Sequence, residues 1–210
     1  ESNYGRFTGS HIIKSALATV IANTPPEIPM PFYDKNNKKR RSRKQYFIDQ
    51  LKSLVTISLN TGYDMHTLKG SWDGGIGLAQ FMPESYQAYA VSPKNDYPDL
   101  FKPEDAIFSI ANYLSVRGKW QPGPIASLVT PAQEVIDVMA DKASIPFDTI
   151  VGHYTDTTKL NHTLTNNHIP SELYQFTQSN SSSVYWLTYP NFDAIRSYNP
   201  RPHYAINIHI

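Results

Sequence analysis

The stretch Leu68–Val91 reads LKGSWDGGIGLAQFMPESYQAYAV, and the other predicted elements lie on either side of it. Its first part, Lys69–Gly77, holds four of the ten glycines. Such a string is commonly a turn between helices, but glycines also let a ligand or another backbone approach closely, because they carry no Cβ. Pro83 and Glu84 fit the first turn of a short helix over Pro83–Ala90. The stretch therefore predicts a glycine-rich loop followed by a helix.

On the N-terminal side, the sequence predicts two helices joined by a basic loop. Apolar residues at helical spacing predict a helix over Ser10–Ala22 and another over Ser42–Leu59, which Asn60-Thr61-Gly62 ends. The prolines and charges of Asn23–Arg41 predict an exposed loop. The positions expected to face the core are Ile13, Leu17, Val20 and Ile21 in the first helix, and Phe47, Leu51, Leu54 and Val55 in the second.

On the C-terminal side, the pattern changes from helical to β-favouring. Pro103 and Pro131 open two further helices, the first running to Val116. Their expected inward positions are Ile107, Ile110, Ala111 and Leu114 in the first, and Val135, Val138 and Met139 in the second. Short pieces at Ile145–Tyr154, Ser171–Gln178 and Ser183–Tyr189 then predict a small β-rich lobe. The final HYAINIHI also alternates as a strand would.

The composition of the 210 residues excludes several classes of protein. The absence of cysteine removes thiol nucleophiles, zinc–thiolate sites and iron–sulfur clusters. No apolar run reaches the roughly 20 residues of a membrane-spanning helix. Seven of the 19 Lys and Arg residues lie between Lys35 and Lys44, although the net charge is only +1. Such a run is usually a solvated loop. Contact with an anionic polymer or a membrane surface stays open, and no nucleic-acid partner is expected.

Motifs for several common chemistries are missing. No two of the seven histidines have HExxH spacing, and there is no G-x-S-x-G turn, phosphate-binding loop or G-x-G-x-x-G. We therefore expect no metal and no cofactor. The 14 tyrosines and three tryptophans would suit the binding of sugars, since aromatic faces stack on pyranose rings. Filling the core is the competing explanation, and composition alone does not decide between them.

Four blocks of sequence, in a characteristic order, point to one family. They are ESNYG at Glu1–Gly5, the stretch Leu68–Val91 quoted above, PEDAIFSIANYL at Pro103–Leu114, and YWLTYPNFDAIRSYNPRPHYA at Tyr185–Ala205. In these residues the chain resembles the catalytic domain of the membrane-bound lytic transglycosylase B family, bacterial enzymes that cleave peptidoglycan. The resemblance implies an α+β, mainly α fold, with a lysozyme-like helical domain and a small β-containing lobe.

The resemblance also implies how the chain is divided. A catalytic helical domain is expected over residues 1–120, with a basic, proline-rich insertion at about 21–45. A helical hairpin and the β-rich lobe would occupy 121–190, and residues 191–210 would return to complete the cleft. The family makes the region Tyr204–Ile210 helical. We prefer that to a strand, because the alternating stretch is short.

The implied reaction is cleavage of the β-1,4 bond between N-acetylmuramic acid and N-acetylglucosamine, with 1,6-anhydromuramic acid as product. Glu1 would act alone, first as acid and then as base, whereas most glycosidases pair two carboxylates. Phe81 and Met82 could supply the apolar setting that keeps such an acid protonated. Two alternatives stay open: a catalytically silent peptidoglycan-binding scaffold, and a hydrolytic muramidase.

The remaining site residues are carried over only where the motifs match. The expected substrate-binding residues are Ser71, Gln80, Tyr46, Tyr113, Tyr198, Asn199, Tyr204 and Arg43. Ser71 and Gln80 would lie near the acid, and Arg43 would lie at the border of the cleft. A purely structural role is the competing explanation for each of them.

The sequence departs from the family pattern at two places relevant to function. Ser92–Lys102 stands where the family has an EF-hand-like loop, but it has only Asp96 and Asp99 as acids and no glycine, so we expect no calcium. The chain also begins at Glu1 itself, so it is an open question whether it is active without a preceding piece. The resemblance further implies that the protein works in the bacterial periplasm or cell envelope. Its partners would be peptidoglycan strands and other cell-wall enzymes, and it would contact the membrane only through a lost N-terminal anchor.

Overall fold

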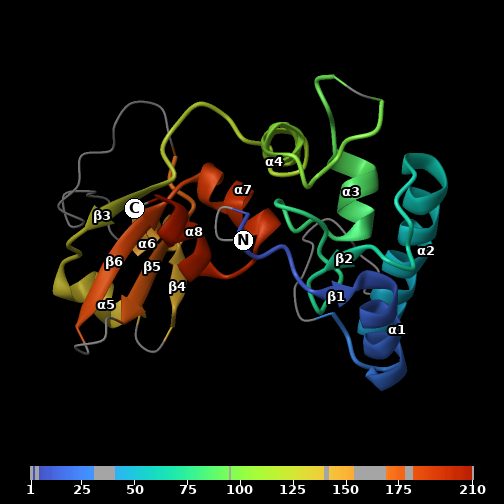
Figure 1. Ribbon diagram of the computed structural model, residues 1–210. Helices are drawn as coiled ribbons and strands as arrows, with labels where there is room; N and C mark the ends of the chain where they lie inside the picture. Colours follow the sequence, from blue (N-terminus) through green and yellow to red (C-terminus); the bar gives the residue numbers. More distant parts are fainter. Residues whose placement is uncertain are drawn as a thin grey trace. The chain divides into compact units, whose positions relative to one another are not determined.

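A computed structural model describes residues 2, 5–30, 41–94, 96–139, 142–153, 169–177 and 182–209. The chain divides into two compact units, Glu1–Tyr113 and Leu114–Ile210. Figure 1 shows the elements of both. Those that begin in the first unit are β1 (His11–Ile12), α1 (Ile13–Asn23), α2 (Arg43–Thr61), β2 (Lys69–Gly70), α3 (Pro83–Tyr89) and α4 (Pro103–Val116). Those of the second are β3 (Ala126–Val129), α5 (Gln133–Met139), β4 (Ser144–Pro146), α6 (Phe147–His153), β5 (Glu172–Thr177), β6 (Ser183–Thr188), α7 (Pro190–Tyr198) and α8 (Pro202–His209).

The first unit is built on helix packing, with α1 against α2 and α2 against α3. Helix α2 begins where the sequence predicts, because the Ser42 hydroxyl accepts from the Gln45 N–H at 3.2 Å and so caps the first turn. It ends at Gly62, whose φ of 74° is a left-handed conformation that glycine adopts without strain. The helices predicted on both sides of the basic loop are therefore confirmed.

The buried faces of these helices differ in part from the prediction. Ile13, Leu17, Phe47 and Leu54 are buried as expected. Val55, however, is 39% exposed, and the buried positions of α2 also include Gln50, Ser53 and Ile57. The face is rotated because Gln50 binds Glu84 in α3, a polar contact that apolar spacing does not reveal.

The inward stripe predicted for α4 is wrong. Ile107 is 64% exposed, and the residues that α4 buries are Asp105, Ala106, Ser109 and Tyr113. The polar members of this face are satisfied by hydrogen bonds: the Ser109 hydroxyl donates to the Val91 carbonyl at 3.1 Å and accepts from the Val91 N–H at 3.0 Å. Because these bonds offset the cost of burying polar groups, the less apolar face of the helix packs inward.

A short antiparallel ribbon joins the glycine-rich loop to the start of α1. His11 in β1 pairs with Gly70 in β2, and Ile12 pairs with Lys69. The two backbones can come this close only because residue 9 is glycine. Gly9 has a φ of 99° and lies so near the Gly70 carbonyl that a Cβ would overlap it. Neither two-residue strand was expected from the sequence, but together they fix the place of the loop.

The second unit contains a four-stranded antiparallel sheet in the order β3-β6-β5-β4 (Figure 1). Side chains alternate across it: Leu173 and Leu187 pack with α5 and α6, whereas Tyr174 and Phe176 pack with α7 and α8. The sheet therefore has a hydrophobic core on each face. The small β-containing lobe expected from the sequence is confirmed.

Two details of this unit correct the sequence analysis. Of the predicted β-favouring piece Ile145–Tyr154, only Ile145 and Pro146 pair with β5, and α6 follows at once; Tyr154 lies outside the described residues. Phe147 and Ile150, three residues apart, both reach the same core, which is helical rather than strand spacing. Strand β3 was not expected. At the end of the chain α8 is a helix, so the choice of helix over strand is confirmed.

Candidate active site

The proposed acid, Glu1, lies outside the described residues. Ser2, which follows it, is buried. The Ser2 hydroxyl accepts from the Gly5 N–H at 3.1 Å, and its carbonyl accepts from the Phe7 N–H at 3.0 Å. These bonds tie Ser2, the neighbour of Glu1 in sequence, to Gly5 and Phe7.

The glycine-rich loop closes on the side chain of Ser71, which is half-buried. The Ser71 hydroxyl donates to the Asp73 carboxylate, with 2.5 Å between Oγ and Oδ1, and accepts from the Gly75 N–H at 2.6 Å. The Ser71 N–H in turn donates to the Gly75 carbonyl at 3.0 Å. Ser71 is thus fixed by both its backbone and its hydroxyl.

Gln80 is held in an unusual backbone conformation, with a φ of 51°. Its side-chain nitrogen, Nε2, donates to the Thr8 carbonyl at 3.0 Å and to the Gly77 carbonyl at 2.7 Å. These two bonds decide which way the amide points, because the reversed amide would place its oxygen against two carbonyl oxygens. The positive φ is maintained by this network, as is common at functional positions.

Gly75 brings Ser71 and Gln80 to the same place. A Cβ at Gly75 would lie 2.8 Å from Ser71 Oγ and 3.0 Å from Gln80 Oε1, so both polar atoms pack closely against this glycine. Two residues that the resemblance places near the acid are therefore neighbours in the folded chain. Neither α-helical nor β-strand periodicity could have predicted this.

Tyr46 lies beside this loop in the first unit. Its ring packs edge-on to Phe47 with 5.2 Å between centroids, and the Arg41 guanidinium lies 4.8 Å from its centroid. Burial, with a further contribution from the charge of Glu84, raises the pKa of Tyr46 to about 12. Asp73 adds to this effect through its charge. The Tyr46 hydroxyl therefore stays protonated, and able to donate, at every physiological pH.

Tyr113 is buried within an aromatic group of the same unit. Its ring lies 4.8 Å from that of Tyr89 and 5.5 Å from that of Phe81, centroid to centroid. Its charge also helps to raise the pKa of Tyr46. The structure thus brings together Tyr46, Ser71, Gln80 and Tyr113, all expected from the sequence, and adds Asp73 to them.

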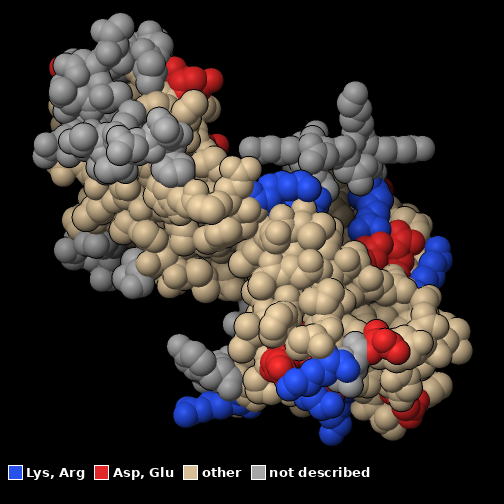
Figure 2. Space-filling model, turned by 90° about the horizontal axis from the view of Figure 1, so that it is seen from above, with Lys and Arg blue, Asp and Glu red and all other residues tan. Residues whose placement is uncertain are grey.

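Arg43 lies slightly apart from this group. Its guanidinium is 5.8 Å from the Phe47 centroid, while it is Arg41 that stacks on Tyr46. Arg41 also donates to both carboxylate oxygens of Glu84, at 2.9 and 2.7 Å, and to Asp49 at 3.0 Å. On the face drawn in Figure 2, Lys and Arg side chains lie beside Asp and Glu side chains in several places.

The other three expected residues belong to the second unit, at the junction of α7 and α8. Tyr198 is the last residue of α7 and Asn199 follows it, with its N–H donating to the Ile195 carbonyl at 3.1 Å. The Asn199 side chain accepts from the Arg201 N–H at 3.2 Å. Tyr204 in α8 packs against the core that includes Phe176. All three side chains are half-buried.

The described part of Ser92–Lys102 is tied to α4 by protein groups. Asp105 is 3% exposed, and its carboxylate accepts from the Ser92 hydroxyl and the Asp99 N–H, both at 2.7 Å. These bonds hold the pKa of Asp105 below its usual range, the Asp99 N–H contributing most. Within the described ranges, no three His, Asp or Glu side chains group as metal ligands. No helix there is long and apolar enough to cross a membrane.

Comparison with known proteins places this geometry in a family. The family described as Transglycosylase SLT domain matches residues 1–210. The chain belongs to this family. It is 31% identical to the membrane-bound lytic murein transglycosylase B of Escherichia coli K12, over 99% of this chain and 52% of that protein. It therefore spans about half the length of that curated relative.

Solved structures agree with this assignment. The soluble lytic transglycosylase SltB1 of Pseudomonas aeruginosa superposes with a TM-score of 0.75 at 27% identity, over 99% of this chain and 64% of that one. The Escherichia coli lytic transglycosylase Slt35, solved with bulgecin A, superposes with a TM-score of 0.74 at 27% identity, over 99% of this chain and 60% of that one. The transglycosylase resemblance and the lysozyme-like α+β fold predicted from the sequence are both confirmed.

Three residues of this transglycosylase SLT domain were not among the expected site residues. Asp73 had a visible signal, since it is the one acid inside the glycine-rich loop and stands two residues after Ser71. Arg41 had none, because it is one of many basic residues in its segment. Glu84 was expected only as an acid in the first turn of α3, and its pairing with Arg41 depends on the tertiary fold.

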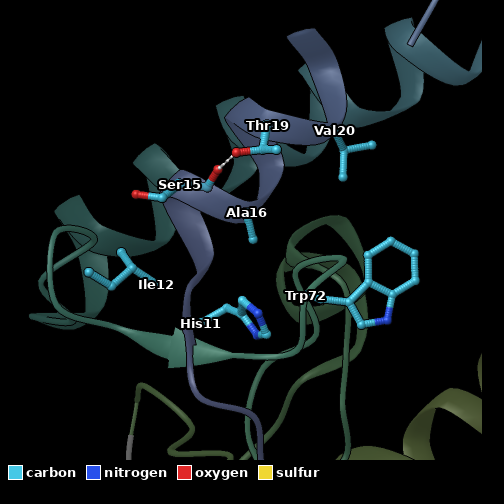
Figure 3. Close-up of a pocket in the computed structure, with 7 residues that line it drawn as sticks. All are labelled: His11, Ile12, Ser15, Ala16, Thr19, Val20 and Trp72. Atoms are coloured by element: carbon cyan, nitrogen blue, oxygen red, sulfur yellow. Dashed lines mark hydrogen bonds between the residues drawn. The ribbon is translucent and has the colours of Figure 1, made fainter. Parts of the chain in front are cut away.

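A separate hollow of about 310 Å³ lies along α1, lined by His11, Ile12, Ser15, Ala16, Thr19, Val20 and Trp72 (Figure 3). Ala16 points into the space between His11 and Trp72, and the indole is 60% exposed. The Thr19 hydroxyl is occupied by the Ser15 carbonyl at 2.8 Å. This mainly apolar hollow contains none of the expected site residues of the domain.

Proposed function

We propose that this chain cleaves the β-1,4 bond between N-acetylmuramic acid and N-acetylglucosamine in peptidoglycan and releases a 1,6-anhydromuramic acid end. The observation that carries the proposal is the match to the transglycosylase SLT family across residues 1–210. The proximity of Tyr46, Ser71, Gln80 and Tyr113 supports it, since aromatic rings and hydrogen-bonding atoms are the groups that bind sugars.

In the proposed reaction, Glu1 donates its proton to the glycosidic oxygen of the departing N-acetylglucosamine while the bond to the anomeric carbon breaks. The muramoyl 6-hydroxyl then bonds to that carbon and gives its proton to the Glu1 carboxylate, which restores the acid. No water is consumed. The positive charge that develops at the anomeric carbon would be shared with the substrate's own N-acetyl group. Tyr198, Asn199 and Tyr204, and Arg43 at the border, are proposed to bind the glycan.

We further propose that the domain works in the bacterial periplasm or cell envelope on peptidoglycan strands. Membrane contact would come only through an anchor outside this chain. The division into a catalytic domain at 1–120, a β-containing lobe at 121–190 and a return segment at 191–210 is part of the same proposal. Other cell-wall enzymes are its candidate partners.

One observation favours a second candidate, a hydrolytic muramidase. Asp73 is a carboxylate beside Ser71, and glycosidases that use water pair an acid with a second carboxylate. In this case Asp73, or a water activated by it, would take the part that the muramoyl 6-hydroxyl has in the anhydro reaction. The two candidates give different products.

Digestion of purified sacculi followed by mass spectrometry tests the proposal. Anhydromuramic ends support the lytic reaction, and reducing ends identify a muramidase. If no sugar fragments are released, the chain is a peptidoglycan-binding module. The Glu1→Gln variant, with residues placed before position 1, is expected to abolish release while glycan still binds. Glu27→Gln is the matched control, since it neutralises an exposed glutamate. Anhydro ends from the Glu1→Gln variant would remove Glu1 from the mechanism.

A further inference from the structure

The polar atoms around Gly75 share one property: each offers only an acceptor to a ligand. Ser71 shows this first. Its single hydroxyl proton is committed to Asp73 Oδ1, 2.5 Å from Ser71 Oγ, and one of its lone pairs takes the Gly75 N–H. What Ser71 retains for a ligand is its other lone pair.

Gln80 is restricted in the same way. Both of its side-chain N–H groups are used by the Thr8 and Gly77 carbonyls. Only the oxygen, Oε1, is left, and it lies against Gly75 together with Ser71 Oγ. An amide that usually both donates and accepts is therefore reduced to an acceptor.

Asp73 adds a negative charge to these acceptors. Its Oδ1 is bound by Ser71, and its Oδ2 has no hydrogen-bond donor among the residues that the structure describes. No Lys or Arg in those same ranges forms an ion pair with it. Asp73 is half-buried, so its charge is less screened than that of a fully exposed side chain.

We propose that Asp73 is a specificity-determining residue that makes the patch of Ser71, Asp73 and Gln80 select hydrogen-bond donors, and above all the protonated free amine of a de-N-acetylated hexosamine. The proposal rests on the proposed function, in which this patch contacts the glycan. A hydroxyl or amide N–H would bind the same acceptors more weakly, because a hydrogen bond between two charged groups is the stronger one. A carboxylate would be repelled.

The test uses two probes of equal length, an oligosaccharide of N-acetylglucosamine and its fully de-N-acetylated counterpart, at mildly acidic pH where the amine is protonated. NMR titration of the labelled chain measures both affinities. We expect the amine probe to bind about tenfold more tightly. Asp73→Asn, which keeps the shape and removes the charge, should abolish this preference. Asp96→Asn, which neutralises an exposed aspartate, should leave it intact.

Salt dependence provides a readout without any variant. The preference of the unaltered chain should shrink as salt is added, since the interaction is between charges. Equal affinity for the two probes, or a preference that survives Asp73→Asn, overturns the proposal. So does binding of neither probe. A variant whose affinities are unchanged but whose turnover of sacculi at saturation is lost would assign Asp73 to the chemistry instead. Release of sugars from sacculi by the unaltered chain tests the proposed function independently.

Discussion

The guanidinium of Arg41 forms two parallel hydrogen bonds with the carboxylate of Glu84, 2.9 Å from Nη1 to Oε1 and 2.7 Å from Nη2 to Oε2. Gln50 binds the same carboxylate and also accepts from the Glu84 N–H at 2.9 Å. The start of α3 is thereby tied to the segment that leads into α2. Because Arg41 also stacks on Tyr46, this pair fixes one border of the candidate site.

A double-mutant cycle on Arg41→Ala and Glu84→Ala should give a coupling free energy of about 1 kcal/mol. The value is modest because both side chains are about one-third exposed, at 36% and 35%, and solvent screens their attraction. Urea unfolding of the four proteins measures it. The cycle on the more exposed Lys94 and Glu104 is the control and should give a smaller coupling. Equal couplings would contradict the geometry described here.

Asp105→Ala should lower the free energy of unfolding by about 1–3 kcal/mol, because the Ser92 hydroxyl and the Asp99 N–H lose their acceptor. The pH dependence follows from the lowered pKa of Asp105. A carboxyl group whose pKa is lower in the folded state stabilises the protein above its unfolded pKa, and this contribution is lost as the pH falls through the folded value. Urea midpoints measured from about pH 6 downward should therefore fall more steeply for the wild-type protein than for Asp105→Asn. Parallel curves would show that Asp105 is not bound in this way.

Gly75→Ala should weaken glycan binding about tenfold or more while the fold is retained. The added methyl group would meet Ser71 Oγ and Gln80 Oε1, displacing both acceptors from their present positions. Titration with an N-acetylglucosamine oligosaccharide measures the effect, and circular dichroism checks the fold. Gly62→Ala is the control: its Cβ would meet nothing within 4 Å, so strain at its φ of 74° should cost stability but not binding. A similar loss of binding in both variants would argue against a role for the two acceptors beside Gly75.

Tyr46→Phe should make the protein lose stability less steeply at alkaline pH. The folded pKa of Tyr46 is raised to about 12, mainly by burial, so its neutral form stabilises the folded state. This contribution is complete below the unfolded pKa of about 10 and is lost as the pH rises through the folded value. Unfolding free energies between about pH 9 and pH 12 in both proteins measure the difference. Identical slopes would mean that Tyr46 is solvated.

Local signals in the sequence were sufficient to predict most helices and part of the sheet. Ser42 and Gly62 mark both ends of α2, because caps act within a single turn. Short runs of β-favouring residues located β5 and β6 but not β3, whose four residues carry too short a pattern. The stripe of α4 was missed for a different reason. Its packing is decided by hydrogen bonds that join Asp105 and Ser109 to residues of the preceding loop, and no spacing of apolar residues encodes these partners.

The sequence by itself determined the family, the glycine-rich loop and the identity of Ser71 and Gln80 as candidate site residues, since each depends on residue order along the chain. Tertiary structure alone decided what those residues can do. Whether Gln80 donates or accepts depends on the Thr8 carbonyl, which is 72 positions away along the chain. The pairing of Arg41 with Glu84 likewise joins residues 43 positions apart. Hydrogen-bond direction and charge pairing are properties of three-dimensional contact, so only the folded chain fixes them.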